Sequence, residues 1–116
     1  MIEENKLLQL IIPQSRHGNK AGCVKVYPNN SVEHEVVKTK VAHKLMNLGF
    51  KVYTETEFTN GKRADIVAIQ NGVGYAVEVL HTESEERYIA KMSSYPEEFT
   101  LVKVRTGEFD YENFKL

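Results

Sequence analysis

The fold is decided by the stretch Ala64-Asp65-Ile66-Val67-Ala68-Ile69-Gln70-Asn71-Gly72-Val73-Gly74-Tyr75-Ala76-Val77-Glu78-Val79-Leu80. Asn71-Gly72 is the preferred pair for a two-residue type I′ turn, so the apolar runs on either side are predicted to form a β-hairpin. With this turn Gln70 faces Val73, and counting outward along both strands brings Asp65 opposite Glu78. The sequence therefore predicts two carboxylates side by side on one face of a strand pair.

Both faces of the predicted hairpin are apolar apart from these two residues. One face carries Ile66, Ala68, Val77 and Val79, and the other carries Val67, Ile69, Ala76 and Leu80. Strands of this kind are typical of a central position in a sheet that is covered on both sides. The apolar flanks therefore favour a functional site over a pair of solvated surface charges.

Two opposed carboxylates repel each other, at a cost of roughly 0.2–1 kcal/mol on an exposed sheet and more when they are desolvated. A cation between Asp65 and Glu78 offsets that repulsion, and a hard divalent metal ion is the simplest candidate. Two alternatives to a metal ion stay open. One carboxylate points into solvent at a strand end, or an Arg or Lys side chain neutralises the pair, for which Arg63 is close enough in the sequence.

Length and composition limit the classes of protein to consider. A chain of 116 residues suits one domain, and its formal charge of −1 gives no overall signature of nucleic-acid binding, so any basic surface is local. The single cysteine, Cys23, excludes an intramolecular disulfide and a cysteine-based zinc cage. The apolar stretch over 7–12 is too short for a membrane span, and no targeting signal is recognised, which favours an intracellular, cytoplasmic protein.

The sequence around the central hairpin predicts the rest of an α/β fold. Residues 7–12 and 23–27 are expected to form an N-terminal β-hairpin around a polar loop. Further strands are expected over 50–55 and 99–104, and a second helix over 83–93. After the N-terminal hairpin the predicted order is α-β-β-β-α-β around a mixed central sheet, with residues 1–116 in one domain.

The first long helix has clear start and stop signals. It is expected to begin at Ser31, or at Asn30 with Glu33 completing a capping box. It is expected to end at about Leu48, because Gly49 is typical of the position just after a helix.

The faces of this helix suggest candidate site residues. Its core stripe is formed by Val37, Val41, Leu45 and Leu48. His34 and Lys38 lie at the margin of the stripe, and Glu35 lies further round beside Lys38. A lysine at such a margin often keeps only its stem on the apolar surface and its ammonium in water. The functional alternative is that Lys38, together with His34, faces the sheet surface that carries the two carboxylates.

This arrangement resembles the PD-(D/E)XK nuclease superfamily, the restriction-endonuclease-like proteins that include archaeal Holliday junction resolvases and CoiA-like competence proteins. The resemblance covers about residues 31–104. Arg63-Ala64-Asp65 stands where the family has Pro-Asp or Ala-Asp, and Glu78-Val79-Leu80 stands where it has (Asp/Glu)-X-Lys. The resemblance implies a core in which Asp65 and Glu78 hold Mg²⁺ or Mn²⁺ and a lysine positions or activates the nucleophile.

One position departs from the family pattern, because Leu80 stands where the family has its lysine. An alkyl group cannot hydrogen-bond a hydroxide or a phosphate oxygen. The resemblance implies that Lys38 supplies the missing ammonium and that Glu35, one turn before it, is an accessory metal ligand. Lys91 is a weaker candidate, because a lysine toward the end of an exposed helix is normally solvated. Glu55 and Glu57 at a strand end could reach the same cleft.

The resemblance therefore favours a magnesium-dependent endonuclease that hydrolyses phosphodiester bonds in DNA, with RNA as a further partner. Phosphate contacts are expected from Arg16, Lys20, Lys62 and Arg63. A homodimer would widen the contact surface of so small a domain. Two alternatives stay open. In one, a nuclease fold without cleavage binds nucleic acid or a protein, with Leu80 as its signature, and in the other an interaction protein uses exposed Tyr53, Tyr88 and Tyr95.

Overall fold

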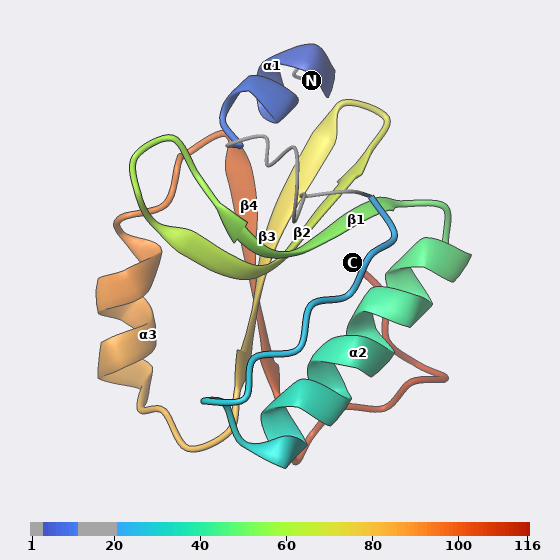
Figure 1. Ribbon diagram of the computed structural model, residues 1–116, viewed down its shortest axis with the longest axis vertical. Helices are drawn as coiled ribbons and strands as arrows, with labels where there is room; N and C mark the ends of the chain where they lie inside the picture. The colour runs from blue at the N-terminus through green and yellow to red at the C-terminus, as the bar shows by residue number, and fades with distance from the viewer. Residues whose placement is uncertain (1–3, 12–20) are drawn as a thin grey trace.

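The computed structural model describes residues 4–11 and 21–116, which form an α/β fold around one four-stranded sheet (Figure 1). The elements in chain order are α1 (Glu4–Gln9), α2 (Val32–Asn47), β1 (Lys51–Glu57), β2 (Arg63–Gln70), β3 (Val73–Leu80), α3 (Glu85–Met92) and β4 (Phe99–Arg105). The sheet has the order β1-β2-β3-β4, in which the first three strands are antiparallel neighbours and β4 runs parallel to β3. From α2 onward this is the predicted order around a mixed sheet.

The two central strands are covered on both faces, as their apolar pattern predicts. On one face, α2 packs its buried residues against Ile66, Ala68, Val77 and Val79. On the other face, Val67, Ile69 and Ala76 pack in a second cluster with Leu7 of α1 and Tyr95 after α3. Figure 1 shows α2 and α3 on opposite sides of the sheet. Two helices on different sides can therefore both present side chains to the ends of β2 and β3.

The β2–β3 hairpin has the predicted turn and register. Asn71 and Gly72 have φ values of 53° and 75°, and a type I′ turn requires positive φ at both central positions. Gln70 pairs with Val73, and the ladder continues outward as far as Ile66 with Val77. The next residues outward on the two strands are Asp65 and Glu78.

The ends of α2 follow the signals in the sequence. Ser31 is the N-cap, and its hydroxyl accepts a hydrogen bond from the His34 N–H at 3.0 Å. Gly49 follows the C-cap with φ of 93°, which glycine adopts without strain. The predicted core stripe is buried except at Leu48, which is 43 % exposed because it lies at the C-cap, beyond the last helical turn.

The predicted N-terminal β-hairpin is wrong. Residues 4–9 form the helix α1, and Ile11 makes only an isolated bridge to Phe58. Leu7 and Ile11 are the buried residues of the segment 4–11, and they lie four positions apart, which is the spacing of one helix face. Leucine also favours helix over strand. The remaining residue of the expected strand and most of the loop, 12–20, lie outside the described residues.

The segment over 23–27, expected to be the partner strand, forms no strand either. It lies beside β1, where Gly22 donates its N–H to the Val52 carbonyl and Lys25 donates its N–H to the Thr54 hydroxyl. A side-chain acceptor replaces a backbone carbonyl in the second contact, so no regular ladder is built.

Candidate active site

The predicted carboxylate pair lies in a cavity of about 440 Å³ lined by residues of α2, α3 and the ends of β2 and β3. The Asp65 N–H donates to the Glu78 carboxylate at 3.4 Å, and the Val79 N–H donates to Asp65 Oδ2 at 2.8 Å. Each carboxylate therefore accepts a hydrogen bond from the backbone of the other strand. The structure brings Asp65 and Glu78 together, as the hairpin register predicts.

Glu78 is held by two side chains from the α3 side of the sheet. The Lys91 ammonium lies 2.8 Å from Glu78 Oε2, and the Tyr95 hydroxyl donates to the other oxygen of the same carboxylate. The Tyr95 hydroxyl oxygen also lies 2.7 Å from the Arg63 carbonyl oxygen, so both acceptors share its single proton. Burial raises the pKa of Glu78 to about 7, and the charge of Asp65 acts in the same direction, while Lys91 and Tyr95 oppose it. This glutamate therefore titrates near neutral pH.

Asp65 is held by a histidine from the α2 side. His34 Nε2 lies 3.2 Å from Asp65 Oδ2, and His34 Nδ1 lies 3.2 Å from a Glu35 oxygen. The hydrogen bond with Asp65 raises the pKa of His34 to about 9, although burial opposes this shift. Burial disfavours the charged form of Asp65, yet the hydrogen bonds from His34 and the Val79 N–H hold its pKa below the usual value. An imidazolium–carboxylate pair is therefore the favoured state at neutral pH.

A second charged cluster, formed by Glu35, Lys38 and Glu55, lies between α2 and β1. Lys38 has no exposed surface, and its Nζ lies 2.8 Å from a Glu35 oxygen and 3.4 Å from a Glu55 oxygen. The backbone N–H of Tyr27 donates to the same Glu35 carboxylate. Burial raises the pKa of Glu55, and the charge of Asp65 acts in the same direction. We call these three residues the α2 cluster.

Glu55 joins the α2 cluster through an unusual backbone conformation. Its φ is 47°, in the left-handed region that residues with a side chain rarely adopt. Successive side chains of a regular strand point to opposite faces. Here the Thr54 hydroxyl hydrogen-bonds the segment that precedes α2 in the chain, and Glu55 contacts Lys38 of α2. Both consecutive side chains therefore lie on the α2 side of the strand. Such conformations are concentrated at functional sites, where the surrounding contacts offset their cost.

Lys91, rather than Lys38, lies with the carboxylate pair. The ion-pair partners of Lys38 are the two glutamates of the α2 cluster, and no contact within the described residues joins it to Asp65 or Glu78. Lys91 contacts Glu78 directly and lines the cavity. Lys91 lies three residues after Tyr88 and so shares its side of α3, but nothing in the sequence marks Tyr88 as buried.

Glu35, expected to be an accessory metal ligand, has its oxygens bonded to Lys38, His34 and the Tyr27 N–H. Among the residues that the structure describes, its link to Asp65 is His34, which contacts both carboxylates. Within residues 4–11 and 21–116, no group of three or more His, Cys, Asp or Glu side chains is arranged to hold a metal ion. Two carboxylates that share one cavity still fit Mg²⁺, which commonly uses one or two carboxylates and completes its shell with water.

The predicted phosphate contacts have different surroundings. Arg63 lies over the ring of Tyr27 at 5.1 Å and donates to its hydroxyl at 2.6 Å, so it does not neutralise the carboxylate pair. Lys62 is exposed in the loop before β2. Arg16 and Lys20 lie outside the described residues.

The tyrosines that were expected to form an exposed interaction surface are largely covered. Tyr88 and Tyr95 are 9 % and 8 % exposed, and Tyr53 is half-buried against the second core cluster. This part of the interaction-protein alternative is wrong. The reason for the two buried rings is that α3 places Tyr88 beside Lys103 of β4, and the turn after α3 places Tyr95 against Glu78 and Phe58.

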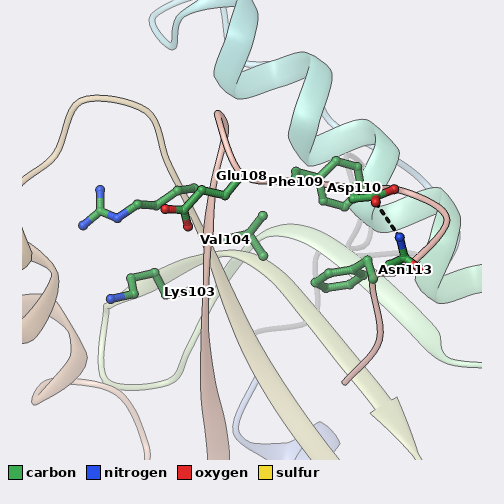
Figure 2. A pocket seen from close by; sticks show the side chains of 8 residues that line it. Lys103, Val104, Glu108, Phe109, Asp110 and Asn113 are labelled. Carbon is green, nitrogen blue, oxygen red and sulfur yellow. Dashed lines mark hydrogen bonds between the residues drawn. The ribbon is translucent and has the colours of Figure 1, made fainter.

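A second cavity, of about 270 Å³, lies between the end of β4 and the C-terminal segment (Figure 2). Three of the four charged residues that line it already have partners, because Lys103 and Arg105 both contact Glu85, and Asp110 accepts a hydrogen bond from Asn113. Figure 2 shows the Asp110–Asn113 bond among the side chains that line the cavity. We therefore place the candidate active site at the carboxylate pair.

Comparisons with known proteins give no family for this chain. No family model matches it, and no curated protein or solved structure shows significant similarity to it. Among the described residues, none of the helices combines the length and the apolar character that crossing a bilayer requires.

Proposed function

We propose that this protein is a divalent-metal-dependent endonuclease with a restriction-endonuclease-like core, which hydrolyses phosphodiester bonds in DNA. The observation that carries the proposal is the contact of Lys91 with Glu78 beside Asp65 in one cavity. Two acidic residues from a hairpin and an ammonium from the following helix supply the residue types of a (Asp/Glu)-X-Lys site. The ammonium comes from α3, and the motif position itself is Leu80.

The chain's own residues have distinct tasks in this reaction. The oxygen of a water molecule bonds to phosphorus and gives up one proton to solvent, the ester P–O bond breaks, and the leaving oxygen takes up a proton from solvent. Lys91 donates hydrogen bonds to the phosphate oxygens as their negative charge grows. Tyr95 holds the Glu78 carboxylate in place, and His34 does the same for Asp65. Both carboxylates are thereby oriented before a substrate arrives.

Asp65 and Glu78 would hold Mg²⁺ or Mn²⁺, which supplies Lewis-acid stabilisation of the phosphoryl group when bound. The buried like-charged pair favours a divalent ion, because the charge of Asp65 disfavours ionisation of Glu78. His34 and Lys91 now contact these carboxylates, and a divalent ion would compete with both cations for the same oxygens. Glu35 would act through His34, and Lys38 through Glu35.

The proposal is tested by cleavage of linear duplex, branched and single-stranded DNA, and of RNA, with Mg²⁺ or Mn²⁺ supplied. We expect metal-dependent cleavage that Asp65→Asn and Glu78→Gln abolish, together with loss of divalent-metal binding in calorimetry. The control is Glu97→Gln, which removes an exposed carboxylate outside the cavity. Cleavage that persists in both site variants, or none by the unmodified protein on any of these substrates, would overturn the proposal.

The second candidate function is a nuclease-like module that binds nucleic acid without cutting it. Leu80 at the motif position favours it, and so does the presence of a protein cation on each carboxylate. Salt-dependent DNA binding without cleavage is the result that this function predicts. A homodimer and the contribution of Lys62 and Arg63 to binding stay predictions under either function.

A further inference from the structure

The cavity holds one cation that the proposed reaction does not use. Arg87 lines the cavity together with Asp65, Glu78 and Lys91. It lies on α3, four residues before Lys91, so the two side chains leave the same face of the helix, about 6 Å apart along its axis. The nuclease cavity therefore has a second positive group one helical turn away from the Lys91 ammonium.

Among residues 4–11 and 21–116, no side-chain partner is present for the Arg87 guanidinium, in contrast to the other cations of the cavity. His34 is paired with Asp65, and Lys91 is paired with Glu78. Arg87 is exposed, and within the described part of the chain its guanidinium makes no ion pair or side-chain hydrogen bond. Glu83 also lines the cavity, but its carboxylate accepts the His81 N–H at 2.8 Å. Arg87 therefore keeps all its donors for a ligand.

The chemistry of a free guanidinium selects an anion with at least two oxygens. Its planar set of donors matches a phosphate bidentately, whereas a lysine ammonium acts as a point charge. We infer that Arg87 binds the phosphate next to the one that is cleaved, so that the enzyme acts on a polynucleotide strand rather than on an isolated phosphodiester. This inference rests on the proposed function and adds a substrate-binding residue to the same site.

The test compares two substrates that differ in the number of phosphates. A short oligodeoxynucleotide offers neighbouring phosphates, and bis(para-nitrophenyl) phosphate offers only one. Arg87→Ala is expected to lower kcat/KM on the oligonucleotide about tenfold more than on the small ester, chiefly through KM, because one charge-assisted contact is lost. Arg87→Lys should retain part of the preference. Lys40→Ala, which removes an exposed cation of α2 outside this cavity, is the matched control.

Binding gives a readout that does not depend on catalysis. With EDTA present, fluorescence anisotropy of a labelled oligonucleotide should show weaker binding by Arg87→Ala. The slope of log affinity against log salt should fall by about 1, as expected for the loss of one phosphate contact. Equal losses on both substrates, or equal affinity and salt slope in the two proteins, would overturn the role of Arg87 while leaving the nuclease proposal intact. Absence of any cleavage by the unmodified protein would overturn the proposed function, and this inference with it.

Discussion

Two lysines in this protein make nearly the same contact and differ in almost everything else. Lys38 in the α2 cluster and Lys91 beside Glu78 each place an ammonium 2.8 Å from a glutamate oxygen. The side chain of Lys38 is fully buried, whereas that of Lys91 is 48 % exposed. A buried ammonium between two carboxylates is fixed by their charge, while a half-exposed one can turn toward a ligand. We therefore expect the ion pair of Lys38 to stabilise the fold, and the ammonium of Lys91 to be able to contact a ligand.

The largest expected effect is on the stability of the α2 cluster. Lys38→Ala leaves Glu35 and Glu55 buried without their cation, and removing one partner of a buried ion pair costs roughly 3–5 kcal/mol. We expect a loss of this size in the free energy of urea unfolding. Glu55→Gln in the Lys38→Ala background should recover part of it, because one buried charge is removed.

Lys91→Ala is the matched control for that measurement. Its partner, Glu78, already has its pKa raised to about 7 by burial, so the carboxyl group can take up a proton when the ammonium is lost. With solvent screening at a half-exposed side chain, the stability change should stay within about 1 kcal/mol. A comparable loss of stability in both variants would remove the distinction between the two lysines.

The next effect concerns His34, which joins the α2 cluster to the carboxylate pair. Its pKa is raised from 6.5 to about 9 in the folded protein by the hydrogen bond with Asp65. A raised folded-state pKa contributes stability that is complete below pH 6.5 and is lost as the pH rises through 9. The loss is at most about 3.5 kcal/mol, since each pKa unit corresponds to about 1.4 kcal/mol.

Urea unfolding of the metal-free protein between pH 6 and pH 9.5 measures this loss, and His34→Gln should flatten the curve over the alkaline part of that range. His43→Gln is the control, because His43 contacts Tyr111 and lies outside the cavity. A curve with the same slope in His34→Gln as in the unmodified protein would show that the pair with Asp65 does not stabilise the fold.

The parts of the site that could be predicted from the sequence are those set by local rules. The Asn71-Gly72 turn determines the register that brings Asp65 to Glu78, and a serine cap sets the start of α2 and so the position of His34. The role of Lys91 depends on how α3 docks on the sheet, and no local pattern encodes that docking. For this reason the ammonium beside Glu78 comes from a helix that the sequence alone suggests is exposed.

The prediction for α1 was wrong for a related reason. A short run of leucine and isoleucine suits a buried strand as well as a helix face, and only the packing of Leu7 and Ile11 against Phe58 distinguishes the two. The positive φ of Glu55 could not be predicted from the sequence either. Its cost is offset by the contact with Lys38, which lies on another element.

For catalysis, the comparison of the two lysines predicts that Lys91→Ala lowers the cleavage rate by roughly 10²-fold or more, because a transition-state contact is lost. Affinity for divalent metal, measured by calorimetry, should not fall comparably, since an ammonium is not a ligand. The companion variant is Lys38→Arg, which keeps the buried positive charge. This protein should remain folded and retain most of the cleavage activity. Full activity in Lys91→Ala would remove Lys91 from the mechanism.

The smallest expected effect is a rescue. Leu80 stands at the motif position, lines the same cavity and is 4 % exposed. Leu80→Lys in the Lys91→Ala background places an ammonium back beside Glu78, and we expect it to raise the cleavage rate about tenfold. The gain is partial, because the new charge is buried and the stem of the lysine replaces an alkyl group that packs in the cavity wall. Leu80→Met in the same background keeps the apolar volume without the charge and should recover nothing. If Leu80→Lys is no better than Leu80→Met while both variants unfold as cooperatively as Lys91→Ala, the two positions do not deliver their ammonium to the same point, and the proposed replacement of the motif lysine by Lys91 fails.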